Sequence, residues 1–227
     1  MNGRPEAVAV HIGADVLESP RHATFARLLS CVDTVDRLSR LCHASGITAQ
    51  RRLLGADATM GRVRDCIGDS AARTGPGGLL VLTFSGHSER AVPGEHDGGW
   101  CLRDGTLHHT DTVRLLAAAP PSAHLVVIAD TCHAAAFATV FADVPVTIVL
   151  VAACGENQTT LNYPVSQFVV TLERLILHHG VPNPDCTSYA WLRQELRRDT
   201  PDVERPDIRT NRSHALRWRP LVSQPSG

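Results

Sequence analysis

Three short polar clusters stand directly after apolar segments of the sequence. They are Ser85-Gly86-His87, Asp130-Thr131-Cys132-His133 and Cys154-Gly155-Glu156-Asn157-Gln158-Thr159. Because ligands and catalytic groups gather at the carboxyl ends of parallel strands, we expect His87 and Cys132 to meet at one edge of a sheet. A Cys–His pair is the minimum for an activated thiolate nucleophile, with the imidazole as general base and acid. The sequence therefore predicts a catalytic dyad of His87 and Cys132.

Both members of this pair have ordinary structural alternatives. A histidine in a loop is often a hydrogen-bonded structural residue, and free cysteines are usually small buried apolar side chains. The position of each residue at the end of a buried strand favours the catalytic interpretation. The backbone N–H groups of Ser88 and Cys132 are then candidates for an oxyanion hole. We expect structural roles for His133 and Cys154.

The apolar pattern around these clusters alternates strands with helices. The expected strands are Ala7–Ile12, Ile47–Leu54, Leu79–Phe84, Trp100–Leu102, His124–Ala129, Thr147–Ala153 and, at an edge, Asp207–Thr210. The expected helices are Thr24–Ala44, Thr59–Ala72, Asp111–Ala118, Tyr163–His178 and Ser188–Arg198. We expect Thr110 or Asp111 to cap the third of these helices. Such alternation is typical of an α/β protein with a mainly parallel sheet.

Length and composition fit one globular domain. The chain has 227 residues, of which 43% are hydrophobic, and it shows no internal repeat and no long linker. We expect a single domain over residues 1–227, with a core over about 7–210 and a Pro- and Arg-rich tail over 211–227. The formal net charge of −1 argues against a nucleic-acid partner, because such binders usually carry a strongly basic domain.

The sequence carries no sign of export or of membrane insertion. Its start, MNGRPEAVAV, lacks a basic region followed by a long apolar one, and no apolar run approaches the roughly 20 residues that span a bilayer. Its seven cysteines form no CxxC pair and suggest no disulfide framework. We therefore expect a cytoplasmic protein with reduced thiols and no membrane partner.

All 22 basic residues are arginine, and the chain contains no lysine. This excludes Schiff-base catalysis, pyridoxal chemistry and a Walker-A phosphate loop, each of which needs a lysine amine. A GC-rich coding sequence is the simpler explanation of the bias. The functional alternative is a lysine-directed protease that avoids cutting itself.

The polar clusters also carry a family resemblance. LLVLTFSGH and HLVVIADTCHAA resemble the YSGHG and DSCHSG signatures of the caspase-like cysteine peptidase clan, closest to bacterial metacaspase-like proteins. CGENQTT is similar to a metacaspase C-x-D-x-Q-T-S stretch, and LLSCVDTVDRLSRL resembles the GCxNDAxxL helix. The resemblance covers about Ala7 to Thr210 and implies a caspase-like three-layer α/β/α sandwich with a mainly parallel sheet of about six strands. Ser88 replaces the usual glycine, and DTCHAA replaces DSCHSG.

The resemblance further implies a pocket for a basic side chain at P1, the substrate residue before the scissile bond. Metacaspases line this pocket with the aspartate two places before the cysteine, which is Asp130 here, and Ser85 also matches a pocket position. A second acidic position of GCxNDA falls on Thr34 in strict register, with Asp33 one place earlier. Asp33 is therefore a further candidate. An acidic pair beside the nucleophile would favour Arg or Lys by charge pairing.

Metal ligands are weakly represented. Some metacaspases bind calcium through aspartates between the two catalytic motifs, but Asp97, Asp104 and Asp111 have no EF-hand spacing and give calcium no support. His108-His109 and His178-His179 are adjacent pairs, which are poor tetrahedral ligands, and no HExxH motif is present. We expect no metal and no cofactor.

Two classes of function follow. The first is a cysteine endopeptidase that cleaves a protein or peptide substrate after Arg or Lys, with no maturation cut in the short segment 133–146. The second is a catalytically inert caspase-like scaffold or signalling protein with a regulatory protein partner, which the altered residues around both motifs suggest. Another acyl transfer by the same dyad, such as ligation, is the more distant alternative.

Overall fold

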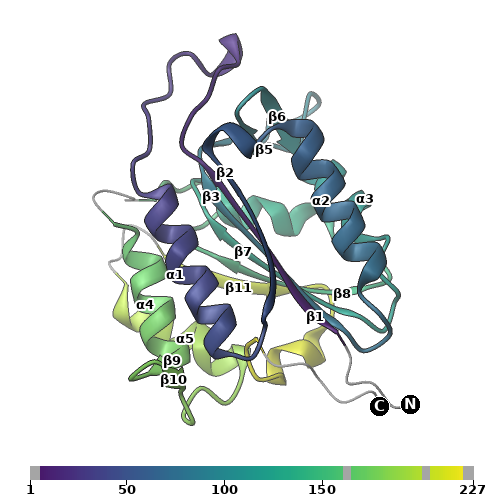
Figure 1. Cartoon of the computed structure of the whole chain (residues 1–227), viewed down its shortest axis with the longest axis vertical. Coiled ribbons are helices and arrows are strands. Elements are labelled where there is room, and N and C mark those ends of the chain that lie inside the picture. Colours follow the sequence, from purple (N-terminus) through teal and green to yellow (C-terminus); the bar gives the residue numbers. More distant parts are fainter. Residues whose placement is uncertain (1–5, 161–164, 201–204, 222–227) are drawn as a thin grey trace.

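A six-stranded sheet forms the centre of the computed structural model, which describes residues 6–160, 165–200 and 205–221. The strand order is β11-β8-β7-β3-β1-β2 (Figure 1). The strands are β1 (Ala7–Ala14), β2 (Ala49–Leu54), β3 (Leu79–Gly86), β7 (His124–Asp130), β8 (Thr147–Ala152) and β11 (Asp207–Thr210). Only β11 is antiparallel to its neighbour, and it lies at the edge. The expected α/β fold with a mainly parallel sheet is confirmed.

Helices cover both faces of this sheet and complete three layers (Figure 1). One face packs against α1 (Cys31–Ala44), α4 (Gln167–Ile176) and α5 (Tyr189–Asp199). The other packs against α2 (Met60–Arg73), α3 (His109–Leu116) and the 3-10 helix η3 (Ala134–Val140). Because both faces are covered, β3 and β8 are buried along their whole length, and they read as continuous apolar runs.

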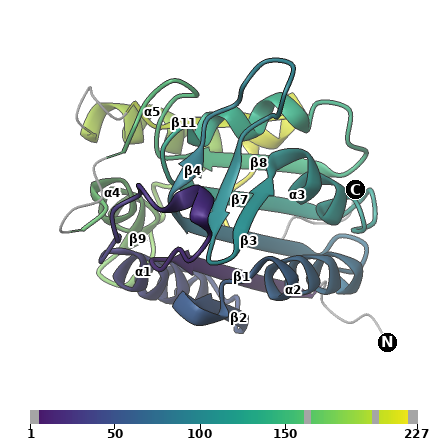
Figure 2. The same ribbon diagram turned by 90° about the horizontal axis from the view of Figure 1, so that it is seen from above.

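A small antiparallel sheet follows β3. It has the order β4 (Ser88–Glu89), β5 (Gly99–Leu102) and β6 (Gly105–His108). Trp100 anchors it to the main core, with its ring stacked on Phe84 at a centroid distance of 4.7 Å and on Phe137 at 5.7 Å. The chain between β1 and α1, which contains η1 (Pro20–His22), lies beside β4 in Figure 2. The site described below is built where these parts meet.

Helix α1 begins later than the apolar spacing predicts. The expected helix starts at Thr24, whereas α1 starts at Cys31. In the intervening segment the apolar side chains do not face the core, since Phe25 is 38% exposed and Leu29 67% exposed. The spacing alone did not distinguish a buried helical face from an apolar loop.

The other expected helix boundaries also shift. The predicted helix Tyr163–His178 begins in residues outside the described part, and α4 runs over Gln167–Ile176. Ser166 caps it, because its Oγ accepts a hydrogen bond from the backbone N–H of Val169 at 3.2 Å. After α4, β9 (Leu177–His178) pairs with β10 (Val181–Pro182).

The C-terminal tail contributes to the core, which the sequence prediction ended near residue 210. The 3-10 helix η4 (Ser213–Arg217) buries Ala215 completely, and Leu221 is 2% exposed. Both belong to the apolar cluster under α1, α4 and α5. The core therefore reaches Leu221, because the apolar residues between the tail arginines pack inward.

Candidate active site

The register of β3 and β7 places the two predicted catalytic residues on adjacent strands. Ser85 pairs with Asp130 in this parallel ladder, and His87 and Cys132 each stand two residues after their member of that pair. Neighbouring strands lie about 4.8 Å apart. The Ser88 hydroxyl donates a hydrogen bond to the Cys132 carbonyl oxygen, which ties the two strand ends together.

Cys132 differs from every other cysteine of the chain in its exposure. All seven cysteines lie in the described residues and are free thiols; six are buried and Cys132 is half-buried. Burial raises the pKa of the Cys42 and Cys186 thiols to about 12, so these cysteines stay protonated. Cys132 is therefore the most exposed of the seven cysteines.

His87 is held from the segment that precedes α1. Its Nε2 lies 2.6 Å from the carbonyl oxygen of Ala26, and its ring stacks on Phe25 with centroids 4.8 Å apart and planes at 14°. A carbonyl oxygen can only accept, so Nε2 carries the hydrogen and Nδ1 of the neutral ring keeps its lone pair. Within the described chain, His87 and the Cys132 thiol make no hydrogen bond to each other.

The backbone near His87 and Cys132 contains two N–H groups without an assigned hydrogen-bond acceptor among the described residues, those of Ser88 and Cys132. Cys101 donates its N–H to the His87 carbonyl, so by the alternation of an antiparallel ladder the next pair, Ser88 and Trp100, does not exchange hydrogen bonds. The Ser88 N–H therefore points away from β5. The Cys132 N–H donates to no described residue.

The turn after Cys132 is fixed by the loop that follows β8. His133 has a φ of 55°, a left-handed conformation that is costly for a residue with a Cβ. Its N–H donates to the Gln158 carbonyl at 2.8 Å, and its Nδ1 lies 3.1 Å from the Glu156 carbonyl. Cys154 is buried and its Sγ lies 3.4 Å from the Thr131 carbonyl. Both residues take the structural places expected of them.

Asp130 lies in a fully buried polar group behind Cys132. Its carboxylate accepts hydrogen bonds from the hydroxyls of Ser166 at 2.8 Å, Ser85 at 3.1 Å and Thr34 at 3.4 Å. Cys31 belongs to the same group: burial, with a further contribution from the negative charge of Asp130, raises the pKa of its thiol to about 12. The structure thus brings together the predicted Asp130 and Ser85.

Asp33 does not join this group, which corrects its expected place in the substrate pocket. Its side chain is 45% exposed and pairs with Arg37 at 2.9 Å on the outer side of α1. Successive helix positions are about 100° apart, so when Thr34 faces inward its neighbour faces out. The strict motif register, which selected Thr34, was the better guide.

Cys31 and Ser166 belong to the Asp130 group but were not selected from the sequence, and Thr34, which the strict motif register indicated, was passed over in favour of Asp33. Thr34 and Cys31 occupy positions of the motif that resembles GCxNDA, so the signal was present. Ser166 stands before the apolar run of α4, where a helix cap is expected, and its second hydrogen bond to Asp130 depends on tertiary structure.

The aspartates considered for calcium are separate and already bonded. Asp97 accepts hydrogen bonds from the backbone and the hydroxyl of Thr110, Asp104 accepts from the Met60 N–H at 2.7 Å, and Asp111 pairs with two arginines. Asp97 thus bonds the first turn of α3 from outside, whereas a residue of the helix itself was expected to cap it. Neither His108-His109 nor His178-His179 belongs to a group of three possible metal ligands in the described residues.

Comparison with known proteins supports the fold but identifies no activity. No protein-family model matches the chain, and no curated protein does. Among solved structures, protein GSU0716 from Geobacter sulfurreducens matches with a TM-score of 0.83 over 97% of this chain and 100% of its own, at 21% identity. Likeness at that identity establishes the architecture alone. In the described residues, no helix is long and apolar enough to cross a membrane.

Proposed function

We propose that the chain is a cysteine endopeptidase of the caspase-like type that cleaves after a basic residue. The observation that carries this proposal is the half-buried thiol of Cys132 on the strand next to His87, whose Nε2–H is fixed by Ala26. An accessible thiol beside an imidazole of defined tautomer is the arrangement that nucleophilic acyl transfer requires.

In the proposed reaction, His87 Nδ1 takes the thiol proton while the Cys132 Sγ attacks the scissile carbonyl carbon. The carbonyl π electrons move to oxygen, and the N–H groups of Ser88 and Cys132 stabilise that oxyanion. Collapse breaks the C–N bond, and the His87 imidazolium returns its proton to the leaving amine. Water, deprotonated by His87, then hydrolyses the thioester and releases the new carboxylic acid and the free thiol.

Asp130 is the proposed determinant of specificity. A guanidinium or ammonium at P1 would join the hydroxyl donors that already face the carboxylate, in a charge-assisted hydrogen bond. Because Asp130 is fully buried, the substrate side chain reaches it only when surrounding side chains such as Thr34 and Ser166 move aside.

Hydrolysis of reporter peptides tests this proposal. We expect the purified protein to cleave reporters with Arg or Lys at P1, and the Cys132→Ala and His87→Ala variants to lose cleavage while keeping the wild-type melting temperature. Cleavage retained by Cys132→Ala refutes the assignment. Product mass separates hydrolysis from ligation.

The ratio of Arg to Lys cleavage tests the meaning of the missing lysines. An enzyme that prefers Lys would find no cleavage site in its own 227 residues, whereas one that prefers Arg would meet 22. A clear Lys preference supports self-protection, and an Arg preference leaves codon usage as the explanation.

An inert scaffold is the second candidate. It is favoured by the absence of a hydrogen bond between His87 and the Cys132 thiol in the described chain and by the closed surroundings of Asp130. A peptide electrophile ending in Arg or Lys distinguishes the two. Labelling of Cys132 that depends on His87 supports the peptidase, and a Cys132 that stays unlabelled supports the scaffold.

A further inference from the structure

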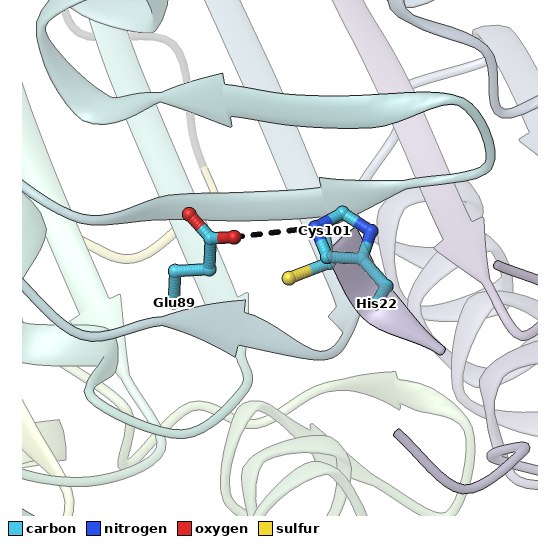
Figure 3. A group of neighbouring side chains, drawn as sticks. All are labelled: His22, Glu89 and Cys101. Atoms are coloured by element: carbon cyan, nitrogen blue, oxygen red, sulfur yellow. Dashed lines mark ion pairs between the residues drawn. The ribbon is translucent and has the colours of Figure 1, made fainter. Parts of the chain in front are cut away.

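A second cluster of reactive side chains lies beside the proposed active site. It consists of His22 from η1, Glu89 from β4 and Cys101 from β5 (Figure 3). One donor atom from each residue lies within 4.8 Å of the other two, and this is the one such group of three in the described residues. His22 and Cys101 are buried, and the Glu89 side chain is 14% exposed.

The spacing of these atoms is close to that of a tetrahedral zinc site. His22 Nε2 and Glu89 Oε1 are 3.3 Å apart. Two nitrogen or oxygen ligands that bind zinc at about 2.1 Å with tetrahedral angles lie about 3.4 Å from each other. The Cys101 Sγ lies within 4.8 Å of both atoms, against about 3.6 Å in a tetrahedral site, so a movement of up to about 1 Å brings it to the position of a third ligand.

Two buried polar atoms of the cluster have no hydrogen-bond partner among the described residues. They are Glu89 Oε2 and His22 Nδ1. Buried carboxylate oxygens are normally paired or bound to a metal, so an ion held by the Glu89 carboxylate would also compensate Oε2. His22 would bind the ion through Nε2, which leaves its Nδ1 as it is. The cation already near Glu89 is Arg21, whose Nε lies 3.4 Å from Oε1, but the Arg21 side chain is 59% exposed and can turn to solvent.

We propose that His22, Glu89 and Cys101 bind one zinc ion, with the fourth position open to water. The donor set combines thiolate, imidazole and carboxylate, which are the three ligand types of protein zinc sites. On binding, the Cys101 thiol gives up its proton to solvent, so Zn²⁺ meets two anionic ligands and one neutral ligand. The resulting net charge of zero suits a buried site. The ion replaces the contact between His22 Nε2 and the Thr106 hydroxyl at 3.0 Å.

The site would also hold the segment that orients His87. Phe25 stacks between His22, at 5.7 Å, and His87, at 4.8 Å, and Ala26 accepts the His87 hydrogen bond. An ion that joins His22 to β4 and β5 therefore fixes residues 20–26 against the small sheet. This consequence for His87 rests on the proposed function, whereas binding of the metal does not.

Metal titration of the full-length Cys132→Ala variant tests the proposal without interference from the nucleophile. We expect the metal-free protein to take up one zinc ion per chain in competition with a chromophoric chelator, and cobalt to give thiolate-to-metal charge-transfer absorption. Loss of a residue that only hydrogen-bonds a metal ligand lowers the affinity for the metal about 10- to 100-fold. Cys101→Ser or His22→Gln in this background should therefore weaken binding by more than about 100-fold.

A matched control and a second readout make the result specific. Cys66→Ser replaces another buried cysteine, on α2 outside the cluster, and should keep full zinc affinity. If Cys101→Ser does not fold, Glu89→Gln should show the same loss of zinc affinity. Glutamine has a shape similar to that of glutamate, and Glu89 lies near the surface. Zinc should also slow amide hydrogen exchange in residues 20–26.

Two results would overturn the proposal: no zinc uptake by folded Cys132→Ala protein, or uptake that survives Cys101→Ser and requires His87. The second result would place zinc at His87 instead of at the cluster. Because Cys132→Ala is inactive by design, failure of the zinc site and failure of the peptidase are separate observations.

Discussion

Replacement of Asp130 by asparagine isolates the charge that we propose to select a basic P1 residue. The amide has almost the same size as the carboxylate and can still bond the hydroxyls of Ser166, Ser85 and Thr34, which lie 2.8 to 3.4 Å from the carboxylate oxygens. The variant therefore removes the negative charge while keeping the packing. The measured quantity is kcat/KM for an Arg reporter relative to a reporter with neutral Gln at P1.

The expected size of the effect follows from the hydrogen bond that is lost. A hydrogen bond to a charged partner is worth about 1.5–3 kcal/mol, against about 1 kcal/mol or less for a neutral one in water. The difference, about 0.5–2 kcal/mol, corresponds to a fall of about 2- to 30-fold in kcat/KM for the Arg reporter. The Gln reporter has no charge to lose, so we expect its cleavage to stay roughly constant.

Asp33→Asn is the matched control, because it makes the same chemical change in the same helix that supplies Thr34. The Asp33 side chain is 45% exposed and pairs with Arg37, so we expect no change in the ratio of Arg to Gln cleavage. An Asp130→Asn protein that melts like the wild type and keeps that ratio would refute the charge mechanism. A fall with Asp33→Asn instead would restore the pocket role that the structure argues against.

Three further predictions concern the surroundings of the dyad and the core. Phe25→Leu removes the ring stack on His87, an interaction worth about 0.5–1.5 kcal/mol. The kcat for the Arg reporter should therefore fall about 2- to 12-fold, with little change in KM. An unchanged kcat would show that the stack does not position the imidazole. Ser166→Ala removes a helix cap and should lower the free energy of unfolding by about 0.5–2 kcal/mol in urea titrations, and no loss would contradict the capping role. Burial lowers the pKa of His11 and His109 to about 4, so the unfolded chain, with values near 6.5, binds protons first as the pH falls. The free energy of unfolding should therefore drop between pH 6.5 and 4, by up to about 3 kcal/mol per histidine, whereas a flat profile in this range would show that these histidines are not buried and neutral.

The strands of the parallel sheet, and the meeting of the ends of β3 and β7, were predictable because they depend on short-range patterns. Apolar runs bounded by polar clusters identified β3 and β7. In a parallel ladder, two residues that stand the same number of places after a pair of opposite residues lie at the same level of the sheet. Ser85 pairs with Asp130, so His87 and Cys132 follow together. Gly86 contributes to this arrangement, because a Cβ there would lie 2.8 Å from Phe84 and 3.2 Å from Ala14.

The parts of the site that sequence did not predict depend on contacts between loops. Phe25 stands at a helical spacing with the residues of α1, yet its ring lies on His87. His22, Glu89 and Cys101 have no recognisable ligand spacing, since each comes from a different element and the turns between those elements bring them together. The pattern of apolar residues along the sequence indicates which side chains share one face of a helix or strand. It does not indicate which loop packs over the end of which strand.

The segment between β1 and α1 connects the two proposals. It holds the imidazole of His87 through Ala26 and Phe25, and it supplies His22 to the proposed zinc site. Residues Ala23 to Arg27 are exposed, and the further side-chain contact of this part of the chain is the ion pair of Arg27 with Asp15 at 3.2 Å. The orientation of His87, the proposed general base, is therefore set by a surface segment whose position a bound ion could stabilise. A caspase-like dyad in this chain would accordingly use the ion for the preorganisation of His87, while β7, the loop after β8 and the Ser88 hydroxyl hold Cys132 without it.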